Sequence, residues 1–365
     1  MTSSSKTRSL PAHWTPLRPI DFPNVISSDD GCRFAKDDAY LEAVLDSWKQ
    51  DTTLSPQRVE TSPWIYHDDD ETPLYGHIVR PIVPKDNHSR ADKNEDVTDG
   101  DDRPLRPGIL LFHTAAGPQD VFLFQKAAKL ASSELGCVVF ICDVLSDPDG
   151  WAWSPDGDRT RFNQVRQQLL QDNARLLRSR VKAAVRALIG RDVDDDNDLS
   201  VDPKRLASMG WCFGAQPILE LTTIQQQEDK KTEADFSAVA LISYHGVYQR
   251  DPPHSPDPSP TATSTETQND HLEQKMEQQQ RDVLICTGKS DPFISRDDLE
   301  FAKTTMEEKM FQVKIIEFEG AKHGFTNPAQ DSNTNPAFEY NEHAATISWE
   351  ATMELLKRKL LIESK

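Results

Sequence analysis

The sequence predicts an α/β fold in which a mainly parallel, doubly wound sheet is flanked by helices. Two observations support this prediction. First, apolar runs of strand length alternate along the chain with longer stretches of helical periodicity, as in proteins that cover a parallel sheet with crossover helices. Second, Cys212, Asp291 and His323 each follow one of these apolar runs. The carboxyl ends of parallel strands share one edge of a sheet, where such folds gather their functional groups.

Six strands are expected where apolar and β-branched residues run together, and helices where apolar residues recur every three or four positions. The longest expected helix shows this spacing at Val165, Leu169, Leu176 and Val181, with arginines between them. The stretch 215–222 is also compatible with a helix. The expected strands cover residues 108–113, 138–143, 206–211, 238–244, 283–287 and 313–318, and the main helices cover 120–134, 162–188, 296–311 and 344–360.

The 365 residues are expected to form one catalytic domain with additions. The domain is predicted to cover residues 58–362. It follows an N-terminal extension, residues 1–57, that is predicted to be partly disordered with one helix near residues 38–49. Three polar insertions lack the apolar residues needed to fold alone and are expected to be surface loops, at 85–104, 191–199 and 250–281.

The segment Gly210-Trp211-Cys212-Phe213-Gly214 has the pattern of a sharp turn between a strand and a helix. Glycines on both sides of Cys212 suit such a turn, because side chains there would collide with the neighbouring backbone. The turn would place the thiol at a helix N-terminus, whose dipole favours the nucleophilic thiolate. The alternative is a buried structural cysteine on an ordinary turn, since free cysteine is among the most buried residue types.

Asp291 and His323 are candidates for an acid and a base. Asp291 follows the apolar run 283–288, but it could instead cap a helix or form an Asx turn before Pro292. His323 follows the run 311–318 in a glycine-containing loop, but it could instead be a histidine without chemistry. The order nucleophile, acid, base favours a catalytic role for all three. His323 would accept the proton of Cys212, Asp291 would orient the imidazole, and the thiolate would attack an acyl carbon.

Two backbone N–H groups are expected to form an oxyanion hole, those of Phe213 and Ala115. Phe213 directly follows the candidate nucleophile, and Ala115 lies in a turn of small residues after the run 108–113. Small side chains at this turn would let a substrate carbonyl approach closely. They also suit a tight strand-to-helix loop, and the two interpretations are compatible.

The chain resembles the dienelactone hydrolase family in the motifs Gly-Trp-Cys-Phe-Gly-Ala, Gly-Lys-Ser-Asp-Pro-Phe and Ala-Lys-His-Gly-Phe-Thr-Asn-Pro. The resemblance implies an α/β-hydrolase fold with a Cys-Asp-His triad formed by Cys212, Asp291 and His323. It also implies the activity of a carboxylic ester hydrolase similar to carboxymethylenebutenolidase. The similarity spans most of residues 60–362, including an opening hairpin at 62–81, a central strand and turn at 108–117, a further strand at 238–247, and a closing helix within 338–350.

One departure from that family is visible. In its founding members, a glutamate after the central strand contacts the resting cysteine and helps to activate it. The matching segment here is His113-Thr114-Ala115-Ala116-Gly117, which has no glutamate. The resemblance alone therefore does not imply substrate-triggered activation, nor does it fix a lactone as the substrate of this chain.

Several other residues could line the pocket, bind substrate or support the site, but no motif assigns them one role. The aromatic residues that could wall an apolar pocket are Phe122, Trp151 and Trp153, although such residues more often simply pack. By analogy with the lactone-hydrolysing members, either Arg159 or Arg161 could hold a substrate carboxylate. A packing or supporting role is favoured for His113 and His245, which are expected at or near strand ends.

Composition limits the partners. The formal net charge of −19 opposes binding to nucleic acid or to an anionic membrane surface. No run approaches a membrane span, and the first sixty residues contain no signal-peptide core. The five cysteines show no zinc-type pattern, so neither a metal nor another cofactor is expected. A cytoplasmic location is expected, although the serine-rich, acid-free residues 1–20 leave organelle targeting open.

The expected function is cleavage of a small ester, a dienelactone-like lactone or a thioester through an acyl-cysteine intermediate at Cys212. The expected partner is the small-molecule substrate, and the expected assembly is a monomer or a homodimer. The alternative is a catalytically weak or inactive binding or scaffold protein that keeps the hydrolase fold. The complete set of nucleophile, acid and base favours the enzyme, whereas the missing glutamate favours the scaffold.

Overall fold

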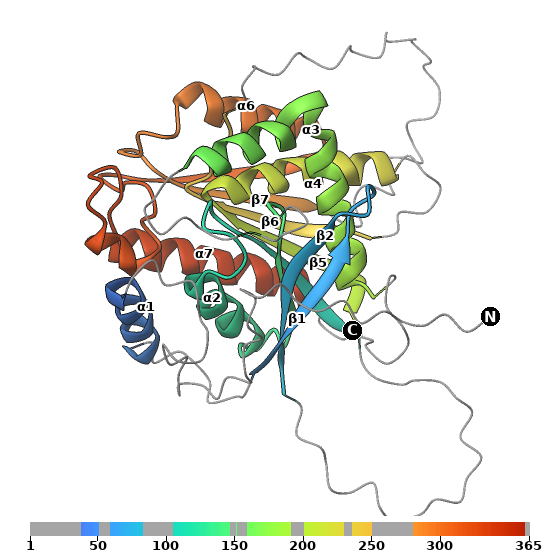
Figure 1. The fold of residues 1–365 in the computed structure, drawn as a ribbon, viewed down its shortest axis with the longest axis horizontal. Coiled ribbons are helices and arrows are strands. Elements are labelled where there is room, and N and C mark those ends of the chain that lie inside the picture. The colour runs from blue at the N-terminus through green and yellow to red at the C-terminus, as the bar shows by residue number, and fades with distance from the viewer. Residues whose placement is uncertain are drawn as a thin grey trace, which may run out of the picture.

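The computed structural model describes residues 38–50, 59–82, 105–146, 151, 159–190, 201–229, 236–249 and 280–361. Within these residues, eight strands form one sheet in the order β1-β2-β4-β3-β5-β6-β7-β8, with helices on both faces (Figure 1). This arrangement confirms the predicted α/β-hydrolase fold class. Of the predicted insertions, only residues 280 and 281 lie within the described residues. Most of the N-terminal extension, residues 1–37 and 51–57, also lies outside them.

The sheet begins with an antiparallel hairpin and continues as a parallel sheet. Strands β1 and β2 pair antiparallel, and β2 pairs antiparallel with β4. The remaining neighbours pair in parallel. The strands are β1 (Val59–His67), β2 (Pro73–Pro81), β3 (Arg106–Phe112), β4 (Val138–Cys142), β5 (Val201–Trp211), β6 (Ala238–Tyr244), β7 (Arg281–Gly288) and β8 (Phe311–Phe318).

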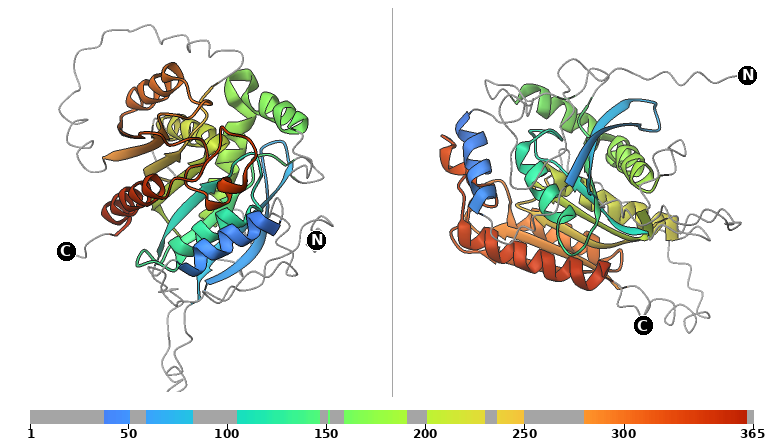
Figure 2. Two further views of the ribbon diagram at one scale, coloured as in Figure 1. Left: turned by 90° about the vertical axis from the view of Figure 1, so that its left-hand side faces the viewer. Right: turned by 90° about the horizontal axis from the view of Figure 1, so that it is seen from below.

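The helices form two layers, and each layer buries one apolar core against the sheet. One core contains residues of α1, α2 and α7, and the other contains residues of α3, α4 and α6 (Figures 1 and 2). Burial on both faces explains why the central strands read as continuous apolar runs. The helices are α1 (Asp38–Gln50), α2 (Val121–Ala131), α3 (Thr160–Leu188), α4 (Ala215–Asp229), α6 (Arg296–Glu307) and α7 (Glu342–Leu360), with short 3-10 turns η3 (Cys212–Gly214) and η4 (Pro328–Ser332).

Side-chain caps fix where three of the helices begin. Asp120, Ser295 and Asn341 each accept a hydrogen bond from a backbone N–H in the first turn of α2, α6 and α7. Helix α3 differs from the continuous helix predicted at 162–188, because residues Gln171 to Ala174 have non-helical dihedral angles. Asp172 and Asn173 lie in this break with positive φ, which Asp and Asn tolerate better than most residues.

A buried ion pair ties the opening hairpin to α3. The Asp68 carboxylate follows β1 and accepts hydrogen bonds from the backbone N–H groups of Asp70 and Thr72. Its other oxygen lies 3.3 Å from Nε of Arg180, whose Nη1 donates to the Val144 carbonyl at 2.7 Å. Both charged side chains are buried. The loss of either partner would leave the other buried without its counter-charge.

We expect Arg180→Met to lower the free energy of unfolding by about 3 kcal/mol, because it leaves the Asp68 carboxylate buried without a cation. The control is Arg186→Met, which removes an ion pair to Asp69 whose side chains are exposed, and which should cost less than about 1 kcal/mol. Urea denaturation of both variants measures the difference. Equal costs would contradict the role given to the buried pair.

Candidate active site

Cys212 lies at a strained turn between β5 and α4. Its φ is +54°, a left-handed conformation that residues other than glycine rarely adopt. A Cβ atom at position 210 would lie under 3.0 Å from the Gly214 carbonyl oxygen, and one at position 214 would lie equally close to the Phe112 carbonyl oxygen. Glycine is therefore required on both sides of the cysteine for steric reasons. The predicted strand-turn-helix geometry is confirmed.

Neighbouring groups hold this turn in place. The backbone N–H of Val247 donates to the Cys212 carbonyl at 3.0 Å. Beneath the turn, the Trp211 ring stacks on Tyr244, with ring centroids 5.2 Å apart and planes 8° apart. Phe122 meets the same indole edge to face at 5.8 Å. This aromatic packing supplies the surroundings that a strained backbone position needs to persist.

Asp291 and His323 come together at the carboxyl edge of the sheet, where Asp291 follows β7 and His323 follows β8. Oδ2 of Asp291 lies 2.7 Å from Nδ1 of His323, and both side chains are buried. Oδ1 of Asp291 accepts a hydrogen bond from the Phe293 N–H at 2.9 Å. The carboxylate thus forms the turn that the sequence also allowed, and its other oxygen holds the imidazole.

Three rings surround the His323 imidazole. Phe293, Phe338 and His245 meet it edge to face, with centroid distances of 5.0, 5.2 and 4.7 Å. The His323 backbone is also fixed, because its N–H donates to the Ala337 carbonyl at 3.1 Å. The ring is therefore held in one orientation by packing as well as by Asp291.

The charges of Cys212 and His323 stabilise each other. Burial opposes ionisation of the thiol, but the positive charge of His323 and hydrogen bonds from His323 and the Phe213 N–H bring the pKa of Cys212 below its ordinary value. Burial likewise opposes the imidazolium, yet the thiolate and the hydrogen bond to Asp291 raise the pKa of His323 to about 9. The thiolate and the imidazolium therefore favour each other, and the two groups titrate as one unit.

The loop after β3 has a fixed shape beside the thiol. The Thr114 hydroxyl accepts a hydrogen bond from the Ala116 N–H at 3.1 Å, and the Trp151 indole N–H donates to the Ala115 carbonyl at 3.2 Å. Trp151 therefore packs beneath this loop, whereas Trp153 lies outside the described residues. Among the described residues, the Ala115 N–H donates no hydrogen bond. Ala115 lines the cavity above Cys212, and its role in an oxyanion hole stays a prediction.

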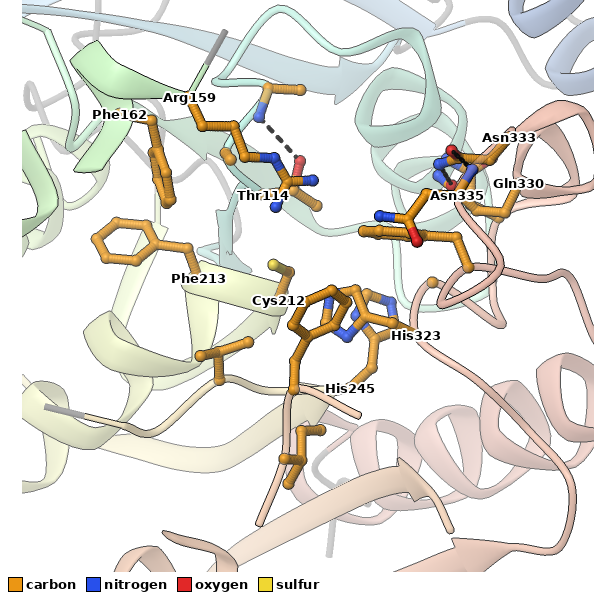
Figure 3. A pocket seen from close by; sticks show the side chains of 18 of the residues that line it. Thr114, Arg159, Phe162, Cys212, Phe213, His245, His323, Gln330, Asn333 and Asn335 are labelled. Atoms are coloured by element: carbon orange, nitrogen blue, oxygen red, sulfur yellow. Dashed lines mark hydrogen bonds between the residues drawn. The ribbon is translucent and has the colours of Figure 1, made fainter. Parts of the chain in front are cut away.

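A cavity of about 650 Å³ opens above Cys212, a volume that suits a ligand of drug size. Figure 3 shows two groups of side chains on opposite sides of the cysteine. On one side lie the rings of Phe162 and Phe213. On the other side lie three amide side chains of the loop that follows His323, namely Gln330, Asn333 and Asn335.

The two other histidines have supporting positions. His113 is fully buried, with Nδ1 donating to the Thr114 carbonyl at 2.7 Å and Nε2 accepting from the Val144 N–H at 3.2 Å. His245 packs against His323, and its Nε2 lies 3.4 Å from the Thr326 hydroxyl. Burial and the nearby His323 charge hold the pKa of His245 well below its ordinary value. Both rings are therefore neutral packing residues near neutral pH.

One group of cavity residues was not found from the sequence. The Tyr40 hydroxyl of α1 donates to Oδ1 of Asp120 at 2.8 Å and accepts a hydrogen bond from Asn327 Nδ2 at 2.8 Å. Burial raises the pKa of Asp120 to about 6. The hydrogen bonds connect three segments distant in sequence, so no local motif could reveal them. Arg159 also lines the cavity, whereas Arg161 packs over the Trp151 ring.

Within the part of the chain that the structure describes, His, Cys, Asp and Glu side chains do not gather in groups of three that could hold a metal ion. No helix within the same residues is long and apolar enough to cross a membrane.

Comparison with known proteins gives one family and several solved structures of the same fold. A family model described as the dienelactone hydrolase family matches residues 97–360. No curated protein matches the chain. Among solved structures, a protein called m3DLH has 20% sequence identity and a TM-score of 0.57, with 82% of this chain and 98% of that chain covered. A dienelactone hydrolase-like promiscuous phosphotriesterase from metagenomic libraries has 19% identity and a TM-score of 0.55, with the same coverage of both chains.

We expect Cys212 to be alkylated by iodoacetamide with an apparent pKa below that of an ordinary thiol. The rate should rise as pH increases through this lowered pKa, because only the thiolate reacts. In His323→Gln the apparent pKa should move upward, since burial then acts without the imidazolium charge. Mass spectrometry of peptides, with buried Cys137 as the internal control, measures the rates. The same apparent pKa in both proteins would contradict the proposed ion pair.

Proposed function

The chain belongs to the dienelactone hydrolase family, and on that premise we propose that it cleaves a carboxylic ester, lactone or thioester through an acyl-cysteine intermediate at Cys212. Family membership assigns it to hydrolases of the esterase type. The observation that carries the finer proposal is the meeting of a thiolate-favouring cysteine with the His323–Asp291 pair in one cavity. The proposed oxyanion hole consists of the N–H groups of Phe213 and Ala115.

Acylation begins when the Cys212 thiolate attacks the acyl carbon, which forms a C–S bond and moves the carbonyl electron pair onto oxygen. The two N–H groups stabilise this oxyanion. As the oxyanion collapses, the bond to the leaving group breaks, and the His323 imidazolium donates its proton to that group. Asp291 holds the ring with Nδ1 toward its own carboxylate, which leaves Nε2 for the proton transfer.

Deacylation uses water as the second substrate. Neutral His323 accepts a proton from the water, and the resulting hydroxide forms a bond to the acyl carbon of the thioester. When the second tetrahedral intermediate collapses, the C–S bond breaks and the thiolate leaves as the carboxylic acid is released. The imidazolium that remains beside the thiolate restores the starting ion pair. No cofactor takes part in this sequence.

Helix α1 contributes to the same cavity although it lies outside the matched residues 97–360. Its Tyr40 contacts Asp120 at the start of α2 and Asn327, four residues beyond His323. Asn327 in turn begins η4 by accepting a hydrogen bond from the Ala329 N–H. We infer that α1 fixes the loop that carries His323 and Asn327, and that α1 is therefore part of the functional unit.

We expect the purified protein to hydrolyse p-nitrophenyl acetate, and Cys212→Ala to reduce the rate by at least about a thousandfold because it removes the nucleophile. His323→Ala should cause a loss of similar order. The matched control is Cys137→Ala, a buried cysteine distant from the cavity, which should keep its activity. The measurement is initial rate by absorbance, with thermal unfolding to verify folding. No rate above buffer on a broad panel of esters, lactones and thioesters would favour the scaffold instead.

We expect Tyr40→Phe to lower the free energy of unfolding by about 1–3 kcal/mol, because Asp120 and Asn327 each lose a buried hydrogen-bond partner. It should also lower kcat/KM for p-nitrophenyl acetate, since the loop that carries His323 loses its anchor. The control is Tyr66→Phe, which removes a buried hydroxyl bonded to the Asp143 backbone, away from the cavity. If both variants lose stability and neither loses activity, α1 has only a structural role.

A further inference from the structure

The cavity above Cys212 has one aromatic wall. The Phe162 ring of α3 meets Phe213 edge to face, with centroids 5.6 Å apart, and Trp151 lies behind Phe162 at 6.5 Å. Phe213 directly follows the nucleophile, so this wall begins beside the reacting atom. Rings arranged edge to face present surfaces on which a further aromatic ring can pack.

The opposite wall offers hydrogen-bond donors. Asn333 Nδ2 donates to Gln330 Oε1 at 2.8 Å, and the Asn335 backbone N–H donates to Asn333 Oδ1 at 3.1 Å. The Ala337 N–H donates to Asn335 Oδ1 at 3.0 Å. These bonds use the amide oxygens to shape the loop. Among the described residues, Gln330 Nε2 and Asn335 Nδ2 donate to no protein group, so this wall matches a ligand rich in acceptor oxygens.

The position of His323 distinguishes the two walls chemically. His323 and the amide side chains belong to one loop. Residue 324 packs closely against Gln330 in this loop, since a Cβ atom at position 324 would lie 2.8 Å from Gln330 Cγ. In Figure 3, His323 lies on the amide side of Cys212, away from Phe162. A leaving group must reach the imidazolium to receive its proton. The leaving alcohol therefore occupies the amide side, and the acyl group occupies the aromatic side.

We propose that the preferred substrate is an ester of an aromatic carboxylic acid with a hydroxyl-rich alcohol such as glycerol or a sugar. This proposal rests on the proposed function. The Cys212 sulfur bonds to the aromatic acyl carbon, the ester C–O bond breaks, and the alcohol leaves with a proton from His323. Water then releases the aromatic acid. Hydroxyl oxygens of the alcohol accept hydrogen bonds from Gln330 and Asn335 during the first half of this sequence.

The test compares three substrates that differ in one part each. Glycerol monobenzoate has both preferred parts, ethyl benzoate lacks the additional hydroxyl groups, and glycerol monoacetate lacks the aromatic ring. The wild type should cleave glycerol monobenzoate with kcat/KM about tenfold above that for each of the other two substrates. One or two neutral hydrogen bonds, or one ring contact, account for a difference of this size. Rates measured by release of acid in a pH-stat give the ratios.

Isosteric variants remove the amide donors of this wall but keep the hydrogen bonds that shape its loop. Gln330→Glu and Asn335→Asp keep the acceptor oxygens that shape the loop but replace the donating NH₂ groups by oxygen. The ratio of kcat/KM for glycerol monobenzoate to that for ethyl benzoate should fall about tenfold in the double variant. The double variant Gln167→Glu with Gln168→Glu is the matched control, because it adds the same two charges on the exposed surface of α3 outside the cavity, and its ratio should match the wild type.

Phe162→Ala tests the aromatic wall. The ratio of kcat/KM for glycerol monobenzoate to that for glycerol monoacetate should fall roughly tenfold, because the acyl ring loses its apolar contact. Unchanged ratios in these variants, or a wild type that shows no preference among substrates it does cleave, would overturn this proposal and leave the hydrolase function standing. Failure of the wild type to cleave any ester would instead overturn the proposed function itself.

Discussion

The left-handed backbone of Cys212 is the constraint on which the site depends. It lets the thiol leave the end of β5 toward the cavity while the chain turns at once into α4. The turn requires glycine at 210 and 214, and it is held by the stacked Trp211 and Tyr244 rings. Because Phe213 directly follows Cys212, a single strained residue sets the position of the proposed nucleophile and of one proposed oxyanion donor.

Much of this arrangement could be predicted from the sequence, because each part leaves a local pattern. Glycines indicate the turn at Cys212, and apolar runs indicate the strands that precede Asp291 and His323. Parallel strands bring their carboxyl ends to one edge, so residues far apart in sequence could be expected to meet. The mutual pKa shifts of Cys212 and His323 follow once that meeting is established.

Other parts could not be predicted, because they depend on contacts between distant segments. The Tyr40, Asp120 and Asn327 hydrogen bonds join residues separated by up to 287 positions, and no periodicity records such a contact. The break in α3 also escaped prediction, since the apolar spacing continues on both sides of Asp172. In the sequence, Gln330, Asn333 and Asn335 appear only as part of a polar loop. Whether their amides offer donors to the cavity depends on which amide atoms form hydrogen bonds within the loop.

The loop from His323 to Asn341 carries both the proposed base and the three amide side chains of the cavity, whereas the aromatic wall comes from α3 and the turn at Cys212. The two halves of the cavity therefore differ in how freely their residues can change without affecting His323. In the proposed binding mode, changes in Phe162 can alter the acyl side while His323 and Asp291 stay in place. Changes in the amide loop disturb the surroundings of His323 at the same time, because Phe338 and the Ala337 carbonyl of that loop hold the ring and its backbone. Preference for the leaving group should therefore diverge more slowly than preference for the acyl group.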